Sequence, residues 1–177
     1  MTQPPRRGAV FFDRDGVLNI DIRFAHRPDQ ITWVRGAAAA VRRVNAAGLW
    51  AFVVTNQSGV ERGLYTDDDV RALHRWMAAR LAEQGARIDA WEFCPHHGPC
   101  RRRKPEAGML EDLIARHDVD RSASLMIGDR DSDMAAAAAA SVRGVLFTGA
   151  DLGDDVDAAL AAALAALGRD AGRGAPP

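Results

Sequence analysis

The sequence predicts an α/β fold, a Rossmann-like parallel sheet with helices on both faces and no large cap domain. Two observations predict it. Short apolar runs alternate with helical patterns along the 177 residues, and chemically reactive polar residues follow directly after several of these runs. Alternation of strand and helix favours a parallel sheet covered on both sides. Ligands of such sheets bind beyond the carboxyl ends of the strands, which is where the polar residues lie.

Five apolar runs predict the strands. Each is short and almost continuously apolar, as expected for a strand that is buried on both faces. They are residues 9–12, 49–54, 90–93, 124–127 and 144–147.

Helical patterns fill the intervals between the strands. An alanine-rich stretch over residues 36–47 stops at Gly48, and Thr66 is a predicted N-cap before three aspartates that complement the helix dipole. The helix after Thr66 has one apolar face and ends at Gly85. Further helices are predicted over residues 108–117, 131–141 and 154–167.

Composition limits the class of protein. Residues 9–167 form one predicted domain between two flexible tails, residues 1–8 and 168–177. The net charge of −1 gives no general attraction to nucleic acid or to an anionic membrane. No apolar run is long enough for a signal peptide or a membrane span, and two cysteines are too few for a disulfide framework. We expect a monomeric, cytoplasmic protein.

Two aspartates follow the first strand. Asp13 and Asp15 are two positions apart, so in extended backbone they point the same way, and Gly16 permits a sharp turn. Carboxylates this close repel unless a hard divalent cation such as Mg²⁺ lies between them. Asp13 then suits a nucleophile and Asp15 a general acid and base. The alternative is an ordinary polar turn at a strand end.

Two other segments offer groups for a phosphate. Thr55 and Asn56 end the second strand, where a hydroxyl and backbone N–H groups can hold phosphate oxygens. Lys104 could neutralise a transferring phosphoryl group and keep Asp13 ionised. The alternatives are a polar loop for the first segment and a solvated basic run, residues 101–104, for the second.

The fourth predicted strand leads into two more carboxylates. Asp129 is a third predicted metal ligand, and Asp133, one helical turn later, could support Lys104 or a metal-bound water. Both could also cap the N-terminus of the following helix.

Four segments together resemble the haloacid dehalogenase (HAD) superfamily of phosphatases over roughly residues 9–148. They are F-F-D-R-D-G-V-L-N (11–19), V-V-T-N-Q-S-G (53–59), R-K-P (103–105) and I-G-D-R-D-S-D (127–133). The resemblance implies Asp13 as nucleophile, Asp15 as acid and base, and Thr55 and Lys104 as phosphate ligands. It implies that Mg²⁺ is held by Asp13, the backbone carbonyl of Asp15, and Asp129.

The intervals between these motifs leave no room for a large cap, so we expect an open site beneath short loops. Residues 21–31 are the predicted flap, in which His26 and Arg27 could reach a substrate phosphate. An exposed loop histidine is the alternative for His26.

The segment C-P-H-H-G-P-C-R-R-R-K-P (94–105) resembles the zinc loop of heptose 1,7-bisphosphate and histidinol-phosphate phosphatases. Cys94, His96 and Cys100 match three zinc ligands, but Arg102 stands at the fourth and cannot ligate. A closed zinc site takes four ligands, so the sequence leaves open whether zinc is bound. The resemblance also implies that Arg103 contacts the substrate.

The sequence thus predicts a magnesium-dependent phosphatase that works through a phospho-aspartate on a small phosphorylated metabolite. A sugar bisphosphate of the heptose type is the first expectation, and histidinol phosphate is the alternative. The hypothesis from another class is a zinc-knuckle module that binds nucleic acid. The near-zero net charge argues against it.

Overall fold

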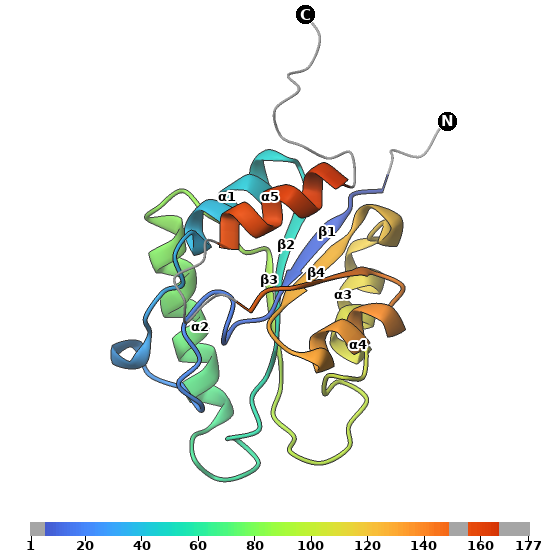
Figure 1. Cartoon of the computed structure of the whole chain (residues 1–177). Helices are drawn as coiled ribbons and strands as arrows, with labels where there is room; N and C mark the ends of the chain where they lie inside the picture. The colour runs from blue at the N-terminus through green and yellow to red at the C-terminus, as the bar shows by residue number, and fades with distance from the viewer. Residues whose placement is uncertain (1–5, 149–155, 167–177) are drawn as a thin grey trace, which may run out of the picture.

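A parallel sheet forms the centre of the molecule, in a computed structural model that describes residues 6–148 and 156–166 (Figure 1). Its strand order is β3-β2-β1-β4-β5, and all four neighbouring pairs are parallel. The strands are β1 (Ala9–Phe12), β2 (Trp50–Asn56), β3 (Ala90–Cys94), β4 (Leu125–Gly128) and β5 (Arg143–Leu146). The predicted α/β fold is confirmed, and β1 lies between the two other strands that carry site residues.

Helices cover both faces of this sheet (Figure 1). The described helices are α1 (Ala37–Ala46), α2 (Asp67–Ala82), α3 (Gly108–His117), α4 (Asp131–Ala139) and α5 (Val156–Ala166), with short 3₁₀ turns at Pro28–Gln30 and Arg121–Ala123. Helices α1, α2 and α5 pack with Val10 and Phe12 of β1, whereas α3 and α4 pack with Ala9 and Phe11. The alternating side chains of β1 therefore supply both cores.

The start of α2 is fixed by the residue that the sequence predicts as its cap. The Thr66 hydroxyl accepts a hydrogen bond from the Asp69 N–H at 3.2 Å, and the Asp69 carboxylate accepts one from the Thr66 N–H at 2.8 Å. This reciprocal pair satisfies two backbone donors that a helix start otherwise leaves open. The predicted N-cap is confirmed.

Two expectations about the ends of the chain are wrong. Strand β5 is not buried, because it is the edge strand and its residues Arg143, Gly144 and Leu146 are exposed. Residues 6–8 do not form a loose tail. The Arg7 guanidinium lies 3.9 Å from the centre of the Trp50 ring, and its Nε donates to the Gly48 carbonyl at 2.8 Å. The remaining predicted tail, residues 1–5 and 168–177, lies outside the described residues.

Within the described ranges, no helix combines the length and the apolar character that crossing a membrane requires.

Candidate active site

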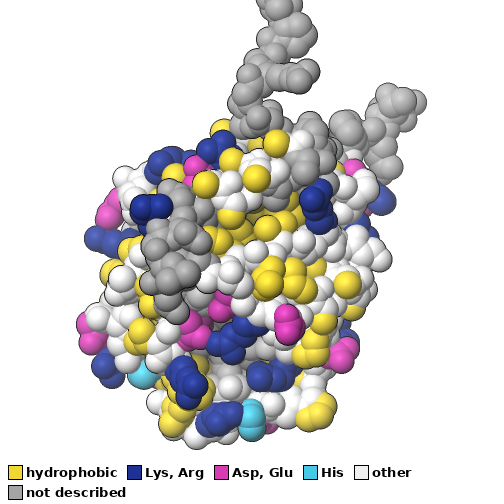
Figure 2. All heavy atoms as spheres, viewed as in Figure 1, with side chains coloured by type: hydrophobic (Ala, Val, Ile, Leu, Met, Phe, Trp, Pro, Cys, Tyr) yellow, Lys and Arg dark blue, Asp and Glu magenta, His cyan; other side chains and the backbone are white. Residues whose placement is uncertain are grey.

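A cavity of about 530 Å³ opens at the carboxyl ends of β1, β2 and β4. Basic and acidic side chains gather on the lower part of the face shown in Figure 2. The cavity is lined by Asp13, Asp15, Asp21, Arg23, Phe24, Thr55, Asn56, Gln57, Ser58, Arg62, Tyr65, Arg103, Lys104, Arg130, Ser132 and Asp133. Its volume suits a small-molecule ligand, and its lining contains most of the predicted site residues.

The charged side chains of Asp13, Lys104, Asp129 and Asp133 meet at the bottom of the cavity and form its floor. Lys104 lies at the centre of this floor. Its Nζ is 2.9 Å from Oδ1 of Asp13 and 2.7 Å from Oδ1 of Asp133, and it donates to the Val54 carbonyl at 2.9 Å. The side chains of all three charged residues are buried. One ammonium group thus ties the ends of β1 and β2 to the start of α4.

Burial and neighbouring charges set the protonation of this floor. Burial raises the pKa of Asp13 to about 7, Lys104 opposes the shift, and the carboxylates of Asp133 and Asp15 add to it. Burial acts to lower the pKa of Lys104, but Asp13 and Asp133 outweigh it, so the net shift is upward. Burial, and then the charge of Asp133, raises the pKa of Asp129. The floor is therefore a place where an added cation would be strongly favoured.

The donor set fits a hard divalent cation. Asp13, Asp129 and Asp133 each offer a carboxylate oxygen within 4.8 Å of the others. Oδ1 of Asp129 is buried and has no hydrogen-bond partner among the described residues. Gly16 allows this approach, because its φ is +89° and a Cβ there would lie 2.2 Å from Oδ2 of Asp129. Oxygen-only donors in such a cluster suit Mg²⁺.

Asp15 is held by a second set of side chains. The buried Arg14 guanidinium contacts both of its carboxylate oxygens, at 3.1 and 2.9 Å. Nδ2 of Asn19 and Nε2 of Gln57 each donate to Asp15 at 2.9 Å. Arg14 is anchored by the Ala25 carbonyl at 2.7 Å. The predicted general acid and base is therefore fixed in orientation by its neighbours.

Gln57 links Asp15 to the predicted phosphate ligand Thr55. Its Nε2 also donates to the Thr55 hydroxyl oxygen at 2.9 Å, and its Oε1 accepts a hydrogen bond from the Tyr65 hydroxyl at 2.8 Å. With its acceptor satisfied by Tyr65, the amide must present its NH₂ group to Asp15 and Thr55.

The side chain of Asn56 binds the backbone of Lys104. Its Nδ2 donates to the Lys104 carbonyl at 2.9 Å, and its Oδ1 accepts from the Lys104 N–H at 3.0 Å. Both groups of the amide therefore position the backbone of Lys104, although Asn56 lines the cavity. Phosphate binding by Asn56 remains a prediction for its other atoms.

The predicted flap, residues 21–31, presents other residues to the cavity than expected. Arg23 and Phe24 line it, whereas Arg27 is exposed and paired with Asp29 at 3.2 Å. The His26 ring stacks on Tyr65, with centroids 4.8 Å apart. Neither His26 nor Arg27 lines the cavity, so the expectation that they reach into it is wrong. Arg23 and Phe24, which do line it, adopt the left-handed backbone conformation (φ +59° and +51°).

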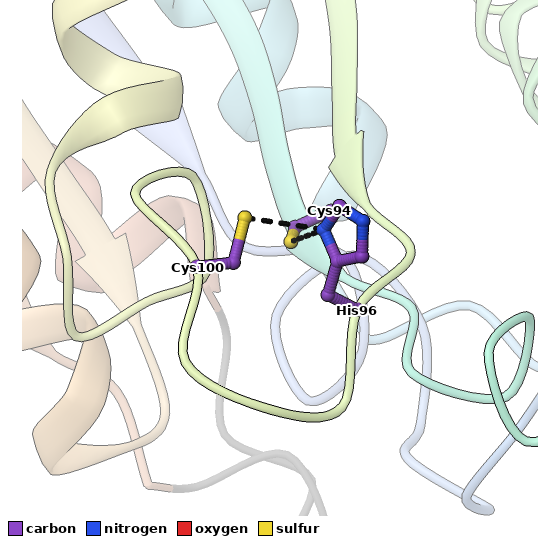
Figure 3. Close-up of side chains that lie close together, drawn as sticks. All are labelled: Cys94, His96 and Cys100. Carbon is purple, nitrogen blue, oxygen red and sulfur yellow. Dashed lines mark hydrogen bonds between the residues drawn. The ribbon is translucent and has the colours of Figure 1, made fainter.

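The three predicted zinc ligands, Cys94, His96 and Cys100, lie close together (Figure 3). Nδ1 of His96 is 3.6 Å from the Cys94 sulfur and 3.1 Å from the Cys100 sulfur. Arg102, at the position of the missing fourth ligand, forms ion pairs with Glu92 and with Asp112. Arg103 donates to the His96 carbonyl at 2.8 Å, so the loop also positions an arginine of the cavity.

Sequence reasoning missed Arg14 and Gln57. Both lie inside recognised motifs, but Gln57 reaches Asp15 from 42 residues away, and Arg14, which contacts the adjacent Asp15, is held by Ala25 and His74, 11 and 60 residues away. The only local signal is that a charged residue and an amide directly follow apolar strands, where a buried polar group needs a partner.

A HAD-hydrolase-like family model matches residues 101–166. A D-glycero-beta-D-manno-heptose-1,7-bisphosphate 7-phosphatase of Rhodopseudomonas palustris is 48% identical over 157 residues, which is 84% of this chain and 87% of the relative. The enzyme of the same name from Escherichia coli K12 is 38% identical over 143 residues, 76% of this chain and 75% of the relative.

Solved structures of heptose 1,7-bisphosphate phosphatases also superpose on this chain. The D,D-heptose 1,7-bisphosphate phosphatase of B. bronchiseptica, complexed with magnesium and phosphate, superposes with a TM-score of 0.80 at 32% identity, over 90% of this chain and 99% of that one. The corresponding protein of Burkholderia thailandensis gives a TM-score of 0.66 at 28% identity, over 89% and 99%.

Proposed function

Because this chain belongs to the HAD superfamily of phosphatases, among the heptose-1,7-bisphosphate 7-phosphatases, we propose that it removes one phosphate from a seven-carbon sugar bisphosphate. The names of its relatives support a heptose bisphosphate over histidinol phosphate as substrate. The observation that carries the proposal is the floor of the cavity, where Asp13, Lys104, Asp129 and Asp133 meet.

The first chemical step falls to Asp13. One of its carboxylate oxygens attacks phosphorus while the bond from phosphorus to the sugar oxygen breaks, which leaves an aspartyl phosphate. Asp15 gives the departing oxygen its proton. The Lys104 ammonium and the Thr55 hydroxyl hold the phosphoryl oxygens throughout this step.

The second step regenerates the enzyme. Asp15, now ionised, takes a proton from a water molecule that attacks the aspartyl phosphate, so that inorganic phosphate leaves and Asp13 is restored. Arg14 and Gln57 keep Asp15 in place for both proton transfers. Mg²⁺, held by Asp13, Asp129 and the backbone carbonyl of Asp15, would neutralise charge on the transferring group. Asp133 then supports Lys104 and the metal site.

We also propose Arg103 as a ligand of the phosphate that is not cleaved, because its planar fork can bind two phosphate oxygens and it lines the cavity. The proposed enzyme is a cytoplasmic monomer. Mg²⁺ is its proposed cofactor. Zinc has weaker support, since only three of four ligands are present in the Cys94–Cys100 loop.

A panel of phosphorylated metabolites tests the proposal. With Mg²⁺, the purified protein should hydrolyse D-glycero-D-manno-heptose 1,7-bisphosphate with a much higher kcat/KM than histidinol phosphate or p-nitrophenyl phosphate. A preference for histidinol phosphate would overturn the assigned substrate but leave the phosphatase chemistry intact.

A further inference from the structure

A histidine lies on the buried face of helix α2, among apolar side chains. The buried residues of α2 are Val70, Leu73, His74, Met77 and Leu81. The His74 ring packs against two aromatic rings of β3, with centroids 4.9 Å from Trp91 and 6.0 Å from Phe93. A polar ring in such surroundings is costly to bury unless it makes a hydrogen bond.

His74 makes its hydrogen bond to a buried arginine beside the cavity. Its Nε2 lies 3.3 Å from Nη1 of Arg14, whose side chain is fully buried. A guanidinium has N–H donors and no acceptor, so Nε2 must accept and the proton of the neutral ring must be on Nδ1. Burial, and then the charges of Arg14 and Arg71, keeps the pKa of His74 well below its usual 6.5, which supports a neutral ring.

The other nitrogens of the Arg14 guanidinium hold Asp15. Nε and Nη2 face the Asp15 carboxylate, at 3.3 and 2.9 Å, and Nη2 also donates to the Ala25 carbonyl at 2.7 Å. For Nη1, the described residues offer His74 as the hydrogen-bond partner. Because a guanidinium is a rigid plane, any turn that gave Nη1 another acceptor would also move Nε and Nη2 relative to Asp15.

We propose that His74 is a positioning residue for the general acid. It fixes the Arg14 guanidinium, which in turn aims the Asp15 carboxyl group at the departing oxygen of the substrate. The inference rests on the proposed function, in which Asp15 protonates that oxygen. His74 therefore affects the chemistry from α2, although it does not line the cavity.

Three variants test this inference. His74→Leu removes the acceptor and keeps an apolar side chain in the core, whereas His74→Gln offers Oε1 as a new acceptor for Arg14. His117→Leu is the matched control, because this histidine also packs on aromatic rings, those of Trp50 and Phe52, and does not line the cavity. Circular dichroism checks folding, and His74→Met is the second apolar variant if leucine prevents it.

The readout compares two aryl phosphates of similar size that differ in their leaving group. Phenol has a pKa of about 10, as tyrosine does, so phenolate needs a proton from Asp15 as it departs. The p-nitrophenolate ion is a much weaker base and needs that proton far less. The parameter is kcat/KM, which covers the steps up to departure of the alcohol and excludes the later attack of water.

In His74→Leu we expect kcat/KM for phenyl phosphate to fall about tenfold more than kcat/KM for p-nitrophenyl phosphate, the scale of one lost hydrogen bond to a charged group. His74→Gln should restore most of this difference, and His117→Leu should behave as wild type. Equal falls on both substrates would show that His74 serves packing alone and would overturn the inference. A selective fall that glutamine does not reverse would overturn it as well.

A second measurement needs no turnover. Nitrogen-15 correlation spectra of the histidine rings, with His74→Gln to assign the signals, should show His74 neutral with its proton on Nδ1. A proton on Nε2 would overturn the inference, because that nitrogen could not then accept from Arg14. If wild type hydrolyses no phosphate ester, the proposed function fails and the catalytic role of His74 fails with it. If wild type is active but both aryl phosphates respond equally in His74→Leu, the role of His74 alone fails.

Discussion

At the scale of single residues, Asp13 is the group on which the proposed chemistry depends. Asp13→Asn keeps the volume but removes the nucleophilic carboxylate, so hydrolysis of p-nitrophenyl phosphate should fall to roughly 1% of wild type or less, equivalent to about 2.7 kcal/mol in the barrier. Asp68→Asn, on the exposed surface of α2, is the control and should be fully active. Retention of a tenth of the activity in Asp13→Asn would contradict the assignment.

Gln57 gives a residue-scale prediction that the sequence motif alone does not. Gln57→Leu removes the amide that donates to Asp15 and Thr55 and leaves the Tyr65 hydroxyl without its acceptor. We expect kcat to fall about tenfold, the scale of one or two lost hydrogen bonds. Gln84→Leu, on an exposed glutamine, serves as the control. Equal kcat in Gln57→Leu and wild type would show that Asp15 needs no support from this amide.

These residues mark what could be predicted from sequence. Asp13, Asp15 and Asp129 follow the ends of β1 and β4, Thr55 lies near the end of β2, and a parallel sheet brings such ends together. Lys104 lies on the loop between β3 and α3, and its assignment came from the motif. The role of Gln57 depends on Asp15, 42 residues away, and the Arg14 side chain is held beside Asp15 by Ala25 and His74, 11 and 60 residues away. No local pattern encodes these contacts. The prediction for the flap was wrong about which side chains line the cavity, because the left-handed conformation of Arg23 and Phe24, neither of them glycine, has no signal in the sequence.

At the scale of elements, α2 contains a buried histidine that should make stability depend on pH. His74 packs against Trp91 and faces Arg14, 3.3 Å away. Burial, and then the charges of Arg14 and Arg71, holds the pKa of His74 well below its usual 6.5. Below pH 6.5, His74 takes up a proton in the unfolded chain but stays neutral in the folded chain. The contribution of neutral His74 to the free energy of unfolding is therefore fully present above pH 6.5 and is lost as the pH falls below it.

Urea unfolding at pH 7.5 and pH 5.5 measures this effect. His74→Gln keeps an acceptor for Arg14 but does not titrate. Wild type should lose about 1.4 kcal/mol more than the variant between the two pH values, because one pH unit below the unfolded pKa costs that much per proton. The same pH dependence in both proteins would show that His74 is not the titrating group.

The loop between β3 and α3 has three predicted zinc ligands and an arginine at the position of the fourth. Arg102 instead forms ion pairs with Glu92 and Asp112, which hold the loop against β3 and α3. The backbone N–H of Arg102 lowers the pKa of the Cys100 thiol, which favours the thiolate form that metals bind. Because Arg102 cannot ligate and a closed zinc site takes four ligands, we expect little zinc in the wild-type protein, and Arg102→Cys should supply the fourth ligand.

Metal analysis after dialysis should give about one zinc per chain in Arg102→Cys and much less in wild type, since a closed site takes four ligands. Arg101→Cys, one residue earlier, is the control for an added thiol. Stoichiometric zinc in wild type would contradict the prediction and would mean that another group completes the site.

At the scale of the whole molecule, the carboxylate cluster links metal binding to global stability. Asp13, Asp129 and Asp133 hold buried oxygens within 4.8 Å of one another, and the pKa values of Asp13 and Asp129 are raised. These groups come from the end of β1, the end of β4 and the start of α4, so their repulsion opposes the native arrangement of the central sheet. A cation that binds only the folded chain stabilises it by mass action.

Thermal unfolding with and without Mg²⁺ should therefore differ. At a Mg²⁺ concentration of 100 times Kd the stabilisation is about 2.7 kcal/mol, which in a domain of this size corresponds to a rise in Tm of roughly 5–10 °C. Ca²⁺ chelators should not abolish the rise when Mg²⁺ is in excess, whereas removal of all divalent cations should.

Asp129→Asn removes one ligand charge with little change in volume, so it should shrink the rise and shift the Mg²⁺ dependence of activity to higher concentration. Asp131→Asn, exposed in the first turn of α4, is the matched control and should respond to Mg²⁺ as wild type does. If Asp129→Asn retained the full rise in Tm, the stabilising ion would have to bind away from the cluster, and Asp129 could not be one of its ligands.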